Sequence, residues 1–142
     1  MKNASLIIQN LRAEGQRITP VRAAMIKILS KSAEPLTPQE ILSALLRKKI
    51  RANKTTIYRQ LEALKYSKII YEVRLTDRTK RYELFSPGNH HHHLVCNVCK
   101  KIEDVSFPAD LKTQEKIILK KNKFKVTDHS LEFFGTCLTC QN

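Results

Sequence analysis

The chain of 142 residues is long enough for one ordinary domain or two small ones, and 42% of its residues are hydrophobic. No apolar run approaches the roughly 20 residues that cross a bilayer, and three glycines are too few for a glycine-rich phosphate loop. The net charge of +13 favours a nucleic-acid partner, although a solvated basic surface or a membrane-surface patch has a similar composition. Residues 1–11 contain one basic residue and no long apolar core, unlike a secretory signal, so we expect a cytoplasmic protein.

The charge is unevenly distributed along the chain. Residues 1–86 contain 18 lysines and arginines against 7 acidic residues, whereas residues 87–142 contain 8 lysines against 6 acidic residues. All nine arginines lie in the first part, and arginine suits bidentate contacts with phosphate and guanine. The change coincides with the turn-like sequence at 86–89, Ser-Pro-Gly-Asn. We therefore expect a DNA-binding domain at 1–86 and a dimerisation and metal-binding domain at 87–142.

The first domain is predicted to begin with helices. A short helix is expected over Ala4–Arg12. Thr19 and Thr37 are each followed by proline, as at an N-cap and first helical position, and Glu40 is placed to complete a capping box. Asn53 is expected to cap a last helix. Its inward face carries apolar residues at helical spacing: Ile57, Leu61 and Leu64.

A two-stranded wing is predicted after the last helix. Residues 69–74 and 81–85 are rich in strand-forming residues and flank a polar turn. Helices followed by such a hairpin are the order of a winged helix-turn-helix domain. The outward face of the last helix would then meet the major groove and its phosphates through Thr55, Thr56, Tyr58 and Arg59. Basic residues of the wing would add phosphate contacts: Arg74, Arg78, Lys80 and Arg81.

The second domain is predicted to be a small α/β unit. Residues 92–95 and 101–107 would form a hairpin, residues 111–121 a helix, and residues 124–127 and 130–134 two further strands. A unit of this size needs a cross-link such as a bound metal ion to be stable. Its apolar strands are best buried against a second copy, so we expect a homodimer.

All four cysteines fall in two Cys-x-x-Cys pairs, Cys96 with Cys99 and Cys137 with Cys140. Two such pairs are a strong signature of one structural zinc ion held by four thiolates. Two disulfides are the alternative, but a reducing cytoplasm disfavours them. A redox Cys-x-x-Cys pair usually occurs singly.

A run of four histidines, residues 90–93, leads into the first cysteine pair. On a strand the odd-numbered members face one side and the even-numbered members the other, so one run can serve two metal sites. Three residues are candidate partners: Glu83, Asp104 and His129. Such nitrogen and oxygen ligands suit Fe(II), Mn(II), Zn(II) or Ni(II), whereas the alternative is a solvated linker without a specific metal. Ligands from both domains would link metal binding to DNA affinity.

Four stretches of the sequence together resemble the Fur (ferric uptake regulator) family of metal-responsive bacterial repressors. They read GQRITPVR at 15–22, KTTIYRQL at 54–61, HHHHLVCNVC at 90–99 and DHSLEFFG at 128–135, and the resemblance extends to the last cysteine pair. It implies an α+β fold with an N-terminal winged helix-turn-helix domain, followed by a small α/β dimerisation domain with a four-cysteine structural zinc. It also implies a homodimer that binds a palindromic double-stranded DNA operator when loaded with metal, without a small-molecule substrate.

The resemblance also assigns roles to individual residues. It places Arg17 and Arg22 in the family's first DNA-contacting stretch, and Tyr58 and Arg59 on its recognition helix. It matches four residues to a regulatory Fe²⁺, Mn²⁺ or Zn²⁺ site at the interdomain hinge: Glu83, His91, His93 and Asp104. It matches a further site to His90, His92 and His129, with Asp110 or Glu115 as the acid. It assigns the structural Zn²⁺ to the four cysteines.

Departures from the family pattern leave the sensed metal open. Pro35 stands where the family often has one more sensor histidine, which the peroxide-sensing branch oxidises, and Glu34 is a candidate substitute. The cysteine that the zinc-sensing branch often has near Phe85 is absent, and Lys100 replaces a usual glycine, which predicts a looser turn there. Because the matched ligands are nitrogen and oxygen only, an iron-type regulator is favoured over a zinc-uptake or peroxide regulator.

Three other classes of protein share some of these features. A DNA-binding module whose zinc is purely structural would have the same first domain, and only the behaviour of the histidines distinguishes it. A metal-storage protein would not need arginines concentrated in one domain. A zinc hydrolase or deaminase needs an open coordination position, which four thiolates do not leave, so we expect no enzymatic activity.

Overall fold

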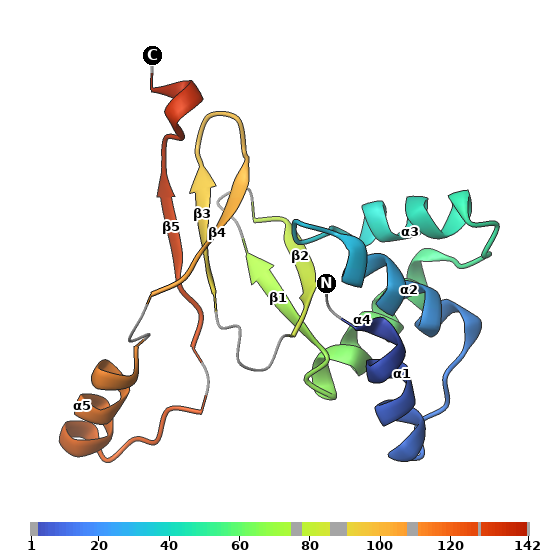
Figure 1. The fold of residues 1–142 in the computed structure, drawn as a ribbon, viewed down its shortest axis with the longest axis horizontal. Coiled ribbons are helices and arrows are strands. Elements are labelled where there is room, and N and C mark those ends of the chain that lie inside the picture. The colour runs from blue at the N-terminus through green and yellow to red at the C-terminus, as the bar shows by residue number, and fades with distance from the viewer. Residues whose placement is uncertain (1–2, 75–77, 86–90, 108–110, 128, 142) are drawn as a thin grey trace. The chain divides into compact units, whose positions relative to one another are not determined.

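Helices dominate the first of two units of the chain, Met1–Ser86, and a sheet dominates the second, Pro87–Asn142 (Figure 1). The computed structural model describes residues 3–74, 78–85, 91–107, 111–127 and 129–141. No helix within these ranges is both long and apolar enough to cross a membrane.

Within its described residues, the first unit has four helices followed by an antiparallel hairpin: α1 (Ala4–Ala13), α2 (Pro20–Lys31), α3 (Pro38–Arg47), α4 (Lys54–Tyr66), β1 (Ile70–Arg74) and β2 (Lys80–Leu84). The predicted caps are confirmed, because Thr19, Thr37 and Asn53 each accept a hydrogen bond from a backbone amide three residues on. Glu40 completes the predicted capping box by accepting from the Thr37 amide at 2.7 Å. The winged helix-turn-helix order predicted from the sequence is therefore present.

The core of the first unit lies where its helices meet the hairpin. The predicted inward face of α4 is fully buried at Ile57, Leu61 and Leu64. Tyr82 of β2 is also buried, and its backbone forms a pair of hydrogen bonds with Leu36 at 2.7 and 2.9 Å. This bridge attaches the wing to the segment between α2 and α3, and both α4 and the wing contribute buried side chains to one hydrophobic core.

The second unit is built around a three-stranded sheet. Its described elements are β3 (His92–Cys96), β4 (Ile102–Val105), α5 (Lys112–Asn122), β5 (Glu132–Gly135) and a short 3-10 turn, η1 (Leu138–Cys140). The strand order is β4-β3-β5, with β3 antiparallel to β4 and parallel to β5. A parallel pair needs a crossover connection, and the segment that contains α5 supplies it.

The predicted strand at 124–127 is wrong. Helix α5 ends at Asn122, and its C-cap residue Lys123 has a left-handed φ of 54°. The residues that follow are irregular, with Phe124 64% exposed. Strand-forming residues make a strand only beside a partner, and residues 124–127 pair with none of the three strands β4, β3 and β5. Helix α5 exposes apolar side chains in the described part of the chain, since Ile117 is 49% exposed and Ile118 37%.

Candidate metal centre and nucleic-acid interface

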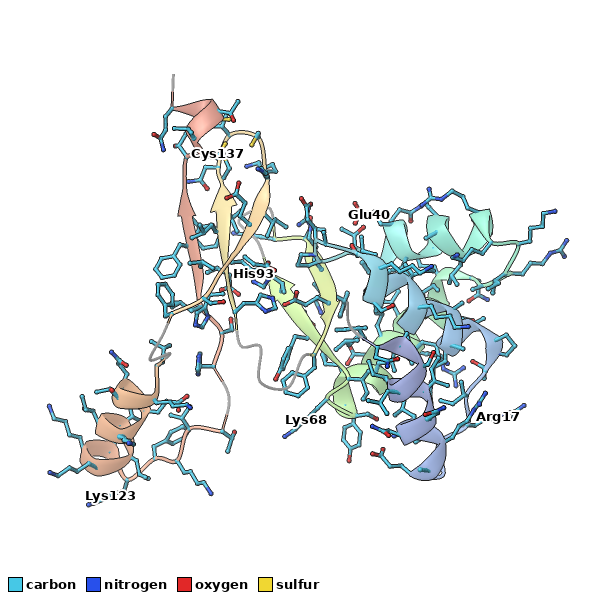
Figure 2. All side chains as sticks on the ribbon, in the orientation of Figure 1. Arg17, Glu40, Lys68, His93, Lys123 and Cys137 are labelled. Atoms are coloured by element: carbon cyan, nitrogen blue, oxygen red, sulfur yellow. The ribbon has the colours of Figure 1, made fainter. Side chains whose placement is uncertain are left out.

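The two cysteine pairs come together at one end of the sheet of the second unit. Cys96 ends β3 and Cys99 lies in the turn after it, while Cys137, labelled in Figure 2, and Cys140 follow β5. All four sulfurs lie within 4.8 Å of one another, and Cys99 Sγ is 3.7 Å from Cys137 Sγ. Four sulfurs placed tetrahedrally about 2.3 Å from one zinc ion are about 3.8 Å apart. The donor type and the spacing therefore fit a closed zinc site.

The parallel pairing of β3 with β5 brings the cysteine pairs together. Cys96 is in register with Gly135, and the Asn97 amide donates to the Gly135 carbonyl at 2.8 Å. The turn between the first two cysteines is tight, contrary to the expectation from the missing glycine. Lys100 adopts a left-handed φ of 64°, and its amide donates to the Cys96 carbonyl at 3.0 Å. A lysine is strained in this conformation, which glycine adopts freely.

The environment of the cysteine sulfurs separates their proton affinities. The Cys137 amide donates to Cys96 Sγ at 3.4 Å, and this bond, with a second one from Cys99, lowers the pKa of Cys96 to about 6. Hydrogen bonds to Cys137 and Cys99 raise the pKa of Cys140 to about 12. Zinc binds thiolates, so a bound ion would displace the proton of the Cys140 thiol.

A second group of possible ligands lies on β3 and β4. His91 Nε2 is 3.9 Å and His93 Nε2 is 4.0 Å from the same oxygen of Asp104, and the two imidazole rings are 5.2 Å apart between centroids. His93, labelled in Figure 2, is directly opposite Asp104 in the β3–β4 register. An ion about 2.0–2.2 Å from each donor fits between atoms about 4 Å apart. His91, His93 and Asp104 therefore supply a mixed nitrogen and oxygen donor set of the kind that divalent metal ions bind.

The other residue predicted for the regulatory site belongs to the first unit. Glu83 lies on β2, opposite Tyr71 of β1, and is half-buried. Its carboxylate has the oxygen donor chemistry that a mixed imidazole and carboxylate site requires.

His92 of β3 lies beside His129, which precedes β5. The rings of His92 and His129 are 5.5 Å apart, and His129 Nδ1 is hydrogen-bonded to Glu115 Oε1 of α5 at 2.7 Å. The two other residues predicted for this site, His90 and Asp110, lie outside the described residues. Among the described residues, Glu115 is therefore an acid that lies beside His129.

The face of α4 opposite the core presents the residues predicted to meet DNA. Thr55 and Arg59 are exposed, Tyr58 is 40% exposed, and Thr56 is half-buried. Arg17, labelled in Figure 2, is also exposed, in the segment between α1 and α2. In the wing, Arg78 and Lys80 are exposed and Arg81 is half-buried, while the Arg74 side chain lies outside the described part. Most of the side chains predicted to contact DNA are thus at least partly exposed on the first unit.

Arg22 is placed differently from Arg17. Its side chain is half-buried, and its Nε donates to Gln60 Oε1 of α4 at 2.8 Å. Its Nη1 donates to the Arg17 carbonyl at 3.0 Å. Sequence reasoning missed Gln60 and also Gln16, which donates to Ser67 Oγ at 3.1 Å, because nothing in a linear pattern shows which glutamine lies beside an arginine.

The sequence and the fold are similar to those of metal-dependent and peroxide-responsive regulators. A model of the Ferric uptake regulator family matches residues 13–134. The chain is 36% identical over 135 residues to the Peroxide-responsive repressor PerR of Staphylococcus saprophyticus, covering 95% of this chain and 89% of that protein. It is 31% identical over 137 residues to the Ferric uptake regulation protein of Bacillus subtilis, covering 94% and 91%. A structure of the ferric uptake regulator from Francisella tularensis with iron covers 90% of this chain and 96% of its own, with a TM-score of 0.73 and 26% identity.

Proposed function

Because the chain belongs to the ferric uptake regulator family and is a metal-responsive DNA-binding repressor, we propose that it controls metal uptake, with iron as the favoured metal. The observation that carries the proposal is the convergence of His91 and His93 on one oxygen of Asp104. This donor set contains nitrogen and oxygen but no sulfur, as suits Fe(II) or Mn(II) better than a thiolate site would.

The four-cysteine cluster is assigned to structural zinc. Its sulfurs meet at the end of the sheet and tie the last residues of β5 to the turn after β3. A closed site of this kind contributes to folding and leaves no open position for a substrate. We therefore assign no enzymatic activity to the protein, and we place its action in the cytoplasm, where its DNA lies.

The regulatory site is proposed to combine Glu83 of the first unit with His91, His93 and Asp104 of the second. The part played by Glu83 rests on the family resemblance. A metal ion held by ligands of both units would restrict the angle between them, and in a homodimer this angle sets the spacing of the two recognition helices. Metal affinity and operator affinity would then be coupled, and each would strengthen the other by the same factor.

A further site is proposed at His92 and His129, completed by His90 and an acid. The family resemblance leaves Asp110 or Glu115 as the acid, and the 2.7 Å contact between His129 and Glu115 supports Glu115. The ring of His92 is nearly buried between Phe107 and His129, so a metal there would order the start of α5 against the sheet.

DNA contacts are proposed for the exposed face of α4 and the segment before α2. Thr55, Thr56, Tyr58 and Arg59 would meet the edges of bases and the phosphates of one half-site, since a recognition helix lies in the major groove. Arg17 would reach the adjacent backbone or minor groove. The protein binds DNA as a homodimer, for which we propose a palindromic operator.

The decisive experiment measures DNA affinity at controlled metal occupancy. Zinc-replete protein is titrated anaerobically with Fe(II), Mn(II) and Zn(II), using a duplex selected by the wild-type protein from a random pool. One metal should tighten binding at least about tenfold, or 1.4 kcal/mol of coupling, and the His91→Ala/His93→Ala variant should lose this gain. His129→Ala serves as a matched control that separates one regulatory site from two. Equal affinity with and without added metal would leave the zinc purely structural and refute the sensor.

Peroxide sensing is the second candidate, because a peroxide-responsive repressor is 36% identical to this chain. The resemblance to the family places a buried proline, Pro35, where the oxidisable histidine is expected. Hydrogen peroxide is therefore applied to the Fe(II)-loaded and Mn(II)-loaded forms, followed by DNA binding and peptide mass spectrometry. Oxygen added to a histidine in the iron form alone, with loss of DNA binding, would establish peroxide sensing over uptake control.

A further inference from the structure

The segment between α1 and α2 is attached to the recognition helix by side chains rather than by backbone pairing. Arg22 of α2 donates from Nε to Gln60 Oε1 and from Nη1 to the Arg17 carbonyl. A single guanidinium therefore contacts both α4 and the backbone of the residue whose side chain is proposed to enter DNA. The Arg22 backbone is fixed as well, because its amide donates to the capping Thr19 hydroxyl at 3.2 Å.

A second contact attaches the same segment further along α4. Gln16 Nε2 donates to Ser67 Oγ at 3.1 Å, and Ser67 is the C-cap of α4. Gln60 and Ser67 are seven residues apart, so they lie on one face of the helix about two turns, or roughly 10 Å, from each other. Two anchors at this separation restrict both the position and the tilt of the segment relative to α4.

The remaining geometry of the segment leaves Arg17 exposed at its centre. Gly15 has a φ of +77°, which lets the chain reverse after α1, and the Gln16 amide donates to the Leu11 carbonyl at 2.9 Å. Arg17 follows at once, with its carbonyl turned towards Arg22 and its side chain exposed. The backbone of Arg17 is thus held by Arg22, while its side chain is left accessible to a partner.

We propose that Arg22 is a positioning residue that holds the Arg17 segment against the recognition helix, and that it does not itself contact a phosphate. The proposal rests on the proposed function, in which Arg17 and the exposed face of α4 bind DNA together. Fixing the segment beforehand reduces the conformational entropy that would be lost when both elements engage the duplex. Lysine cannot replace the residue, because an ammonium lacks the planar fork that serves two acceptors at fixed angles.

The affinity test uses Arg22→Ala and Arg22→Lys, with Arg17→Ala as the matched control from the same segment. The dissociation constant of the active, zinc-replete fraction is measured over a range of salt for the selected duplex and for a scrambled duplex. Both Arg22 variants should bind the selected duplex about tenfold more weakly, with little change for the scrambled duplex and an unchanged salt slope. Arg17→Ala should lower the slope by about one unit.

Two results would overturn the positioning role. If Arg22→Lys binds like the wild type, or if Arg22→Ala lowers the salt slope by about one unit, Arg22 acts through its charge on a phosphate. Gln60→Ala is the second variant, since it removes the acceptor without removing an arginine. Gln60→Ala should weaken binding to the selected duplex in the same way. The Arg22→Ala/Gln60→Ala double variant should bind no more weakly than whichever single variant has the lower affinity. Additive losses would contradict a shared contact.

Hydrogen exchange without DNA tests whether the Arg22 contacts hold the Arg17 segment, independently of the proposed function. Amides at 15–18 should exchange about tenfold faster in Arg22→Ala than in the wild type, while the amides of α3 keep their protection. Unchanged exchange of the amides at 15–18 in Arg22→Ala would refute the positioning role of Arg22, even if the variant binds DNA more weakly. Conversely, if these amides are protected in the wild-type protein but the protein selects no duplex from the random pool, the proposed function alone is refuted.

Discussion

Replacing Cys137 with serine removes one of the four sulfurs that meet at the end of the sheet. Its Sγ is 3.7 Å from Cys99 Sγ, and its amide donates to Cys96 Sγ at 3.4 Å. A serine hydroxyl stays protonated near neutral pH and is a poor zinc ligand, so the closed site becomes incomplete. We expect the variant to lose zinc and, with it, the ordered sheet of the second unit.

The size of the effect follows from how little else holds this unit together in one chain. Its buried hydrophobic side chains among the described residues are Val95, Cys96 and Ile102, and full burial contributes about 1.5–3 kcal/mol for an aliphatic side chain. A structural zinc contributes about 10–16 kcal/mol in small zinc-dependent domains. Loss of the ion therefore removes more than those side chains supply, whereas the core of the first unit is untouched.

The assay combines zinc analysis by mass spectrometry with hydrogen exchange resolved along the chain. In Cys137→Ser, zinc should fall well below one ion per chain, and protection should disappear from β3 and β5 while α2 to α4 keep theirs. Thr139→Ala is the matched control, because Thr139 is exposed and lies between the same two cysteines. A serine variant that retains its zinc, or that loses zinc and keeps the protection of β3, would refute the reasoning.

Four further predictions concern the first unit. Arg59→Ala should weaken binding to the selected duplex at least about tenfold without changing zinc content, because Arg59 is exposed on the DNA-facing side of α4. Affinity for DNA should fall steeply with salt, since each neutralised phosphate releases counterions. Leu61→Ala should lower the free energy of unfolding by about 2–5 kcal/mol, whereas Leu6→Ala at an exposed position should change it by less than about 0.5 kcal/mol. Lys65→Met should cost stability at neutral pH and nothing at strongly alkaline pH, because the carboxylates of Glu72 and Glu62 raise the pKa of Lys65 and stabilise its charged form until the pH passes that raised value.

Each of these predictions has a result that contradicts it. Wild-type affinity in Arg59→Ala would remove that residue from the interface, and a flat salt response would contradict the basic surface. Equal destabilisation by the two leucine variants in denaturant unfolding would contradict the assigned core. A stability difference for Lys65→Met that grows with rising pH would have the wrong sign for the ion pairs of Lys65 with Glu62 and Glu72, which lie at 3.0 Å.

Much of the first unit could be predicted because its signals are local. Thr37, Pro38 and Glu40 define a helix start within four residues, and the capping bonds are made within the same turn. The spacing of Ile57, Leu61 and Leu64 predicts a buried face of one helix without knowledge of what packs against it. The second unit was harder to predict, because strand-forming residues at 124–127 form a strand only if another strand pairs with them, and pairing is decided by the tertiary structure.

By itself the sequence determined which types of metal ligand the chain offers and which of its two domains carries the arginines. Ligand types, their short spacings and the concentration of arginine before residue 87 are properties of the chain, and folding does not alter them. Only the tertiary structure decided which distant side chains meet. It placed Glu115 beside His129 and paired β5 with β3, and it turned Arg22 inwards to Gln60 while Arg17 stayed exposed. The physical reason is that a long side chain takes the direction in which its charge finds a partner, and elements distant in sequence supply that partner.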